Sequence, residues 1–335
     1  MSFMDIAGKA LHAFLVAGVV LPVVSAVMVW AERRVSAFMQ DRLGPNRVGP
    51  AGLLQPIADL LKFIFKEDVI PGHVNKGLYI LAPCIALAPA LIAFCVVPYA
   101  RGMAVAELNV GILLVFAVSS VSVYGVTIGG WASNNKYSLF GGVRASAQMI
   151  SYELALGLSV IPVFLVVGSL NMETIVTWQA ENGWLVLYLF PAWIIFLVSS
   201  YAETNRLPFD CPEAETELVA GYHTEYSSMK FALFFMAEYI HMVTASALSV
   251  TLFFGGYTLP FVDYPAGVWG TVLSGLVFAA KTGVFLFLFI WVRWTLPRFR
   301  YDQLMDLGWK RLLPASLVIL MATAGVIVVV ESFKG

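Results

Sequence analysis

The sequence predicts an all-α polytopic membrane protein: a single membrane domain, residues 1–335, with eight transmembrane helices and a surface amphipathic helix. Composition is the first observation, because 60% of the residues are hydrophobic and only 12% are charged, whereas soluble domains carry about 25% charged residues. The second is the length of the apolar runs, and the third is the sorting of Lys and Arg between alternate loops. Together they exclude an ordinary soluble domain.

Eight apolar segments reach the roughly 20 residues that a spanning helix needs. They are Leu11–Ala31, Gly77–Ala100, Leu108–Asn135, Ala145–Met172, Asn182–Ala202, Phe231–Val262, Tyr264–Val292 and Leu312–Val330. The runs are continuous and contain Gly and Pro, which favours helices over the alternating pattern of an outer-membrane barrel.

Lys and Arg predict the orientation of these segments. Sixteen of the 20 lie after the first, third, fifth and seventh segments. Because positive charge collects on the cytoplasmic side, these loops should face the cytoplasm or matrix, with both termini on the non-cytoplasmic side. The sequence thereby predicts three main cytoplasmic regions: 32–76, an acidic loop 203–230, and a basic and aromatic loop 293–311.

The first cytoplasmic region contains a short amphipathic helix. Leu53, Ile57 and Leu60 share one helical face with Leu61 and Ile64, while Asp59 lies among lysines on the other. The run is too short to span, so it should lie along the membrane surface. Two interpretations stay open: a plain interfacial anchor, or the lip of a lipid-side entrance that turns Asp59 inward.

Carboxylates gather around the acidic loop. Seven of the chain's 21 acids lie between residues 203 and 238, namely Glu203, Asp210, Glu213, Glu215, Glu217, Glu225 and Glu238. A carboxylate inside a spanning run costs roughly 3 kcal/mol on insertion scales, so it marks a proton or ion path by default. If 212–219 is helical, Glu213 and Glu217 stack one turn apart; if it is extended, the loop acids point one way. In both cases like charges should crowd, although the run could also be a solvated face.

Two further ionisable residues lie in predicted spans. Glu153 is either part of the same path or a buried structural glutamate. Lys281 should have a depressed pKa or a carboxylate partner. The 293–311 loop could bind lipid headgroups or an acidic soluble partner.

No redox centre is expected in this chain. Three cysteines without Cys-x-x-Cys spacing cannot hold a four-thiolate cluster, the four histidines are scattered, and no Gly-rich nucleotide motif is present. His12 and His241 could meet as haem ligands, but an intramembrane histidine is more often a hydrogen-bonding packing residue. No metal site and no nucleic-acid partner are expected.

An ordered set of motifs resembles one known family. The motifs are Ala31-Glu32-Arg33-Arg34, Gly44-Pro45-Asn46, Gly52-Leu53-Leu54-Gln55-Pro56-Ile57-Ala58-Asp59, Gly130-Trp131-Ala132-Ser133-Asn134, Ile150-Ser151-Tyr152-Glu153, Ala202-Glu203-Thr204-Asn205-Arg206, Pro208-Phe209-Asp210, Phe234-Phe235-Met236-Ala237-Glu238-Tyr239 and Pro297-Arg298-Phe299-Arg300-Tyr301-Asp302-Gln303. They resemble the H subunit of proton-pumping NADH:quinone oxidoreductase (respiratory complex I), which forms the heel of its membrane arm. The resemblance runs from about residue 20 to 320.

The resemblance implies a role and a set of partners. The chain would carry the soluble redox arm and form with it the chamber that ubiquinone, the substrate, enters from the bilayer. FMN and iron–sulfur clusters would lie only in partner subunits, and nothing would be bound covalently. The partners would be other membrane-arm subunits, the soluble quinone-site and iron–sulfur subunits, and lipid. The location would be the bacterial inner membrane, or the mitochondrial inner membrane for an organellar protein.

Site residues follow from the same resemblance, position by position. Those that would line the chamber or its entrance are Glu32, Arg33, Arg42, Asp59, Phe235, Met236 and Arg293. Those that would form the chain of carboxylates toward the proton channels are Asp59, Glu153, Glu203, Glu213, Glu217 and Glu238.

Two residues depart from the family pattern. His223 adds to the acidic loop a group of a type that titrates near neutral pH, and Cys211 replaces an apolar residue.

Two alternatives also stay open: a homologous subunit of an ion-pumping hydrogenase, and a secondary transporter. The intact entrance helix favours a quinone enzyme, and a transporter should show inverted repeats that these charges do not follow.

Overall fold

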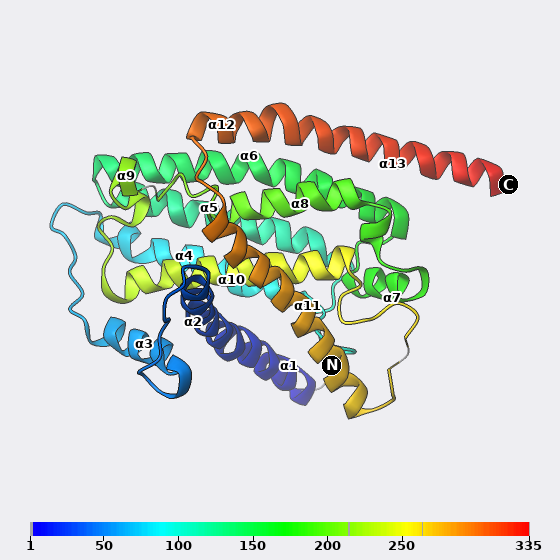
Figure 1. Ribbon diagram of the computed structural model, residues 1–335, viewed down its shortest axis with the longest axis horizontal. Helices are drawn as coiled ribbons and strands as arrows, with labels where there is room; N and C mark the ends of the chain where they lie inside the picture. The colour runs from blue at the N-terminus through cyan, green and yellow to red at the C-terminus, as the bar shows by residue number, and fades with distance from the viewer. Residues whose placement is uncertain (1–2, 214, 263, 335) are drawn as a thin grey trace.

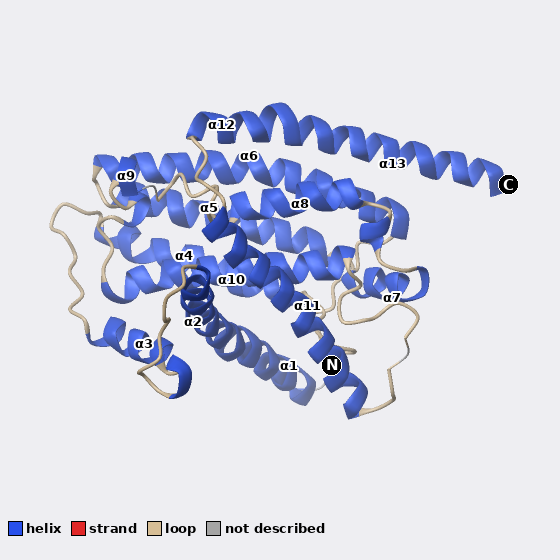
Figure 2. Ribbon diagram, viewed as in Figure 1, coloured by secondary structure: helices blue, strands red, loops and turns tan. Residues whose placement is uncertain are grey.

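The computed structural model describes residues 3–213, 215–262 and 264–334. Within those ranges the chain is built from helices and loops and contains no β-strand (Figure 2). The prediction of an all-α protein is confirmed.

Seven helices in the described ranges are long and apolar enough to cross a membrane, which confirms a polytopic membrane protein. They are α1 (Phe3–Leu15) continued through a π-helical turn into α2 (Leu21–Met39), α4 (Lys76–Phe94), α5 (Gly111–Ala132), α6 (Lys136–Val167), α10 (Ser228–Phe253), α11 (Val268–Thr295), and α12 (Tyr301–Asp306) continued through a π-helical turn into α13 (Leu313–Lys334).

The fifth predicted span differs in form. Instead of one helix over Asn182–Ala202, the chain ends α7 (Met172–Asn182) and starts the apolar helix α8 (Phe190–Glu203) after a 3₁₀ turn. Gly183, with φ 92°, follows α7, and a proline lies in the first turn of α8, so both ends have a local cause. Fourteen residues span about 21 Å, less than the ~30 Å bilayer core. The count of eight crossings stays a prediction.

Five helices, α4, α5, α6, α8 and α10, form the packed centre of the bundle (Figure 1). Small residues allow the closest approaches. A Cβ on Gly125 of α5 would lie 2.5 Å from the backbone nitrogen of Ala86 in α4, and one on Gly130 would lie 2.6 Å from the carbonyl oxygen of Ser138 in α6. Side chains larger than glycine would therefore separate these helices.

The three predicted cytoplasmic regions meet at one end of this centre. The Ser228 hydroxyl donates to the Phe63 carbonyl in α3 (Gln55–Phe65), at 2.8 Å. Arg298 of the last loop donates to Asp210 at 2.9 Å. Figure 1 shows α3 and α9 (Glu215–Leu218) toward one end and α7 toward the other. The three regions therefore lie on one side of the bundle, as the distribution of Lys and Arg requires. That this side faces the cytoplasm stays a prediction.

Lys281 is held by backbone oxygens. Its ammonium donates to the carbonyls of Phe254, Gly256 and Thr258 at 2.7, 3.1 and 2.5 Å, just after α10 ends. These oxygens belong to the segment that the sequence predicted as a continuation of the sixth span to Val262. The lysine thus contacts the C-terminal end of a helix, where cations are favoured, and not a carboxylate.

Candidate functional site

Glu32 of α2 is the meeting point of three elements. It is only 6% exposed, and it accepts hydrogen bonds from Arg293 of α11 and from the Tyr239 hydroxyl of α10, the latter at 2.7 Å. Nη1 of Arg206, in the loop after α8, lies 3.5 Å from the same carboxylate. A carboxylate with this many donors is fully satisfied although it is buried.

Arg206 joins Glu32 to a second carboxylate. Its Nη2 lies 3.7 Å from Glu238 of α10, and its guanidinium carbon lies 4.2 Å from the centre of the Tyr239 ring. The residue is 5% exposed. The sequence prediction did not include Arg206 among the site residues, although it is the first cation after Glu203 in a motif that the resemblance quoted.

Beyond Arg206 the cluster continues into the acidic loop. The Tyr222 hydroxyl lies within donating distance of two carboxylates, 3.0 Å from Glu238 and 3.3 Å from Glu213. His223 Nε2 lies 3.4 Å from Glu213. Burial by itself would raise the pKa of Glu213, but the neighbouring His223, Glu238 and Arg206 lower it to about 2.

Asp210 is a further acid of this loop, close to Glu213 and Arg298. Burial and the neighbouring Glu213 charge raise the pKa of Asp210 to about 6, against the opposing effect of Arg298. Two loop acids that face each other thus have their pKa values moved in opposite directions. Because the two groups interact, their protons are released in two steps that belong to the pair and not to either residue alone.

The arrangement predicted for a helix over 212–219, with Glu213 and Glu217 stacked one turn apart, is wrong. The helix α9 begins only at Glu215, so Glu213 precedes it and the two glutamates do not stack one turn apart. Glu217 is 53% exposed and accepts from Arg144 of α6 at 2.6 Å. Glu213 is crowded by Asp210 and Glu238 instead.

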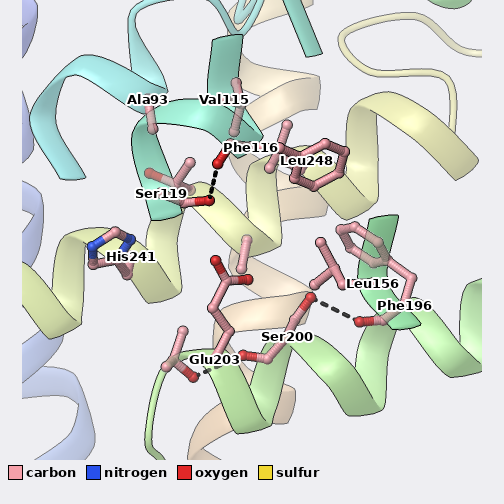
Figure 3. Close-up of a pocket in the computed structure, with 13 residues that line it drawn as sticks. Ala93, Val115, Phe116, Ser119, Leu156, Phe196, Ser200, Glu203, His241 and Leu248 are labelled. Carbon is pink, nitrogen blue, oxygen red and sulfur yellow. Dashed lines mark hydrogen bonds between the residues drawn. The ribbon is translucent and has the colours of Figure 1, made fainter. Parts of the chain in front are cut away.

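Two more predicted carboxylates lie deeper in the bundle. Glu203 ends α8, and its carboxylate points into the space between Ser119 and His241 (Figure 3). Glu153 of α6 accepts a hydrogen bond from Ser120 of α5. Because Ser119 and Ser120 are adjacent in α5, the two glutamates face neighbouring hydroxyls of one helix.

The predicted entrance residues form a separate group near α3. Asp59 accepts from Arg33 of α2 at 2.6 Å, and Lys62 lies 3.7 Å away. The apolar face of α3 is exposed, as the amphipathic pattern predicted. Arg42 lies in an exposed turn and donates to Gln40 at 2.7 Å.

The two apolar site residues lie on α10, next to the acidic residues. Phe235 packs against Phe231, with ring centres 4.7 Å apart, and faces the edge of the His223 ring at 6.3 Å. Met236 is half-buried. The structure therefore brings Glu32, Arg293 and Glu238 into one buried cluster with Glu213, and it leaves Asp59 with Arg33, Arg42 and Glu217 outside that cluster.

Comparisons with known proteins agree with the motifs. The family described as NADH dehydrogenase matches residues 11–324. NADH-quinone oxidoreductase subunit 8 of Rhodothermus marinus is 54% identical over 93% of this chain and 96% of its own. The H subunit of the Salinibacter ruber enzyme is 53% identical over 92% of each chain, and that of Rickettsia bellii 50% over 93% of this chain and 92% of its own. The chain belongs to the NADH dehydrogenase family, as the membrane-embedded H subunit of an NADH-quinone oxidoreductase.

Proposed function

We propose that this chain forms the quinone entrance and chamber together with the soluble redox arm, and that it relays quinone reduction to proton translocation through its carboxylates. Ubiquinone is the substrate, FMN and iron–sulfur clusters belong to partner subunits, and the location is the bacterial inner membrane. The observation that carries the proposal is the continuous buried cluster from Arg293 and Glu32 through Arg206 to Glu238 and Glu213.

The cluster connects the two halves of the proposed function. Arg293 and Glu32 are chamber residues by resemblance, whereas Glu238 and Glu213 are relay residues, and Arg206 contacts one member of each pair. Reducing a quinone to a quinol consumes two protons and changes the charge of the chamber. One unit charge about 4 Å away is worth roughly 4 kcal/mol at an effective dielectric constant of 20. That energy corresponds to about 3 pKa units, enough to move a proton between loop acids.

The entrance is supported by a different arrangement. The exposed apolar face of α3 suits contact with lipid, while Asp59 on the opposite face binds Arg33 of the adjacent helix α2. A quinone that leaves the bilayer beside α3 would pass this ion pair on its way toward Glu32, one residue before Arg33 in α2. The pair can thus orient a polar headgroup at the entrance.

The entrance is tested with Asp59→Ala in the complete enzyme. We expect NADH:quinone activity to fall while NADH oxidation by a hydrophilic artificial acceptor persists, because that acceptor takes electrons upstream in the soluble arm. Asp306→Ala, on an exposed acid in a one-turn pair with Lys310, is the matched control and should change neither rate. Full quinone activity in Asp59→Ala, or an equal loss of both activities, would contradict the entrance role.

A further inference from the structure

Two small cavities lie side by side within the bundle, along the proposed carboxylate path. One, of about 30 Å³, is lined by Glu238 and Tyr222, and the other, of about 20 Å³, is lined by Ser119 and Thr244 (Figure 3). Three residues line both cavities: Glu203, Thr204 and His241. The cavities therefore form a route from Glu238 toward Glu203, and His241 stands where they adjoin.

The route fills a gap in the cluster of charged groups. No hydrogen bond joins Glu238 to Glu203 in the described part of the chain, and the carboxylates within ion-pair distance of Arg206 there are Glu238 and Glu32, not Glu203. His241 lies three residues after Glu238 in α10, so both side chains are on one face of that helix. The imidazole thus lies on the same face of α10 as Glu238, and it lines both cavities together with Glu203.

Two polar atoms along this route are shielded and lack partners. Nε2 of His241 and Oγ1 of Thr244 have no hydrogen-bond partner among the described residues, and Thr244 is only 3% exposed. Buried polar atoms are almost always bonded to protein or to ordered water. The hydroxyls of Ser119 and Ser200 donate to backbone carbonyls of their own helices, so their oxygens can still accept from water. The cavity lining therefore suits a few ordered waters.

We propose that His241 carries protons between Glu238 and Glu203 through water held in these two cavities, an inference that rests on the relay proposed above. A proton that leaves the Glu238 carboxyl binds one ring nitrogen, and the proton on the other ring nitrogen leaves through water to the Glu203 carboxylate. One proton moves and no electron does. The groups that face the ring are the two carboxylates, the Tyr222 hydroxyl across the first cavity and the Thr204 and Thr244 hydroxyls.

The test compares His241→Gln and His241→Phe with the wild type in the whole complex, reconstituted in sealed vesicles. Both variants should lower quinone-driven proton pumping and quinone turnover on the order of 10-fold, because neither side chain can exchange a proton. Electron transfer from NADH to a hydrophilic acceptor should be unchanged. The solvent deuterium isotope effect on quinone turnover should rise in His241→Gln, since proton transfer becomes slower; a purely structural role would leave it as in the wild type.

Matched variants separate the possible failures. His73→Phe, on an exposed loop histidine, should behave as the wild type. Glu203→Gln tests the proposed relay itself. If the complex with this variant pumps protons at the wild-type rate, both the relay proposal and the role of His241 are contradicted. If Glu203→Gln is impaired while His241→Gln pumps at the wild-type rate with an unchanged isotope effect, the role of His241 is overturned and the relay stands.

Discussion

Arg206→Met is expected to abolish quinone-coupled activity of the assembled complex. Arg206 is the one cation within ion-pair distance of Glu238 in the described part of the chain, and it also contacts Glu32. Removing one partner of a buried ion pair leaves an uncompensated charge and costs about 3–5 kcal/mol. Methionine fills a similar volume but restores no charge, so the link between the chamber residues and the acidic loop is lost.

The measurement is NADH:quinone turnover beside NADH oxidation by a hydrophilic acceptor. The expected result is a loss of the first by roughly two orders of magnitude, the usual effect of removing one preorganised charged group from a site, with the second retained. Arg101→Met is the matched control, because Arg101 is exposed in the loop between α4 and α5. Wild-type quinone turnover in Arg206→Met would show that the link between Glu32 and Glu238 is dispensable.

Glu213→Gln and Glu217→Gln are expected to differ strongly, although the two residues lie in one loop. Glu213 faces Glu238, Tyr222 and His223, and its lowered pKa of about 2 keeps it ionised at neutral pH. Glutamine therefore removes a full negative charge from the buried cluster. Glu217 is 53% exposed and paired with Arg144, and exposed pairs contribute only about 0–1 kcal/mol.

Quinone turnover and proton pumping should therefore fall together in Glu213→Gln, on the order of 10-fold, and change little in Glu217→Gln. Both are measured in sealed vesicles, with acceptor reduction as the assembly control. Equal effects of the two substitutions would contradict the conclusion that only Glu213 of these two glutamates belongs to the relay. Glu217 would then also be a relay residue, as the resemblance implies.

The helical architecture was predictable because apolar run length and the sorting of Lys and Arg are properties of the linear sequence. The short helix α3 and its outward apolar face followed from periodicity in the same way. The fifth span was predicted to begin at Asn182, but α7 ends there and α8 begins only at Phe190, because the apolar composition of the segment does not reveal the turn at Gly183. Apolar composition sets which segments can be buried but does not determine where each helix breaks.

For the candidate site, the sequence indicates single residues but not the partners that they contact. Glu238 and Glu203 are conspicuous as carboxylates in or next to apolar runs, a signal that needs no tertiary structure. Arg206 and His241 become meaningful only when α8 and α10 pack together and place them between acids. Conversely, Glu217 lies in an acidic run, but the late start of α9 turns it toward Arg144.

The most direct test of the account is proton translocation by Glu238→Gln in sealed vesicles, measured together with quinone turnover. Glu238 contacts both Arg206 and Tyr222, so it lies between the chamber residues and the acidic loop. If the carboxylates relay quinone reduction, turnover and pumping fall together while reduction of a hydrophilic acceptor is preserved. Full turnover with full pumping in this variant would contradict the relay and leave the buried cluster with a structural role only.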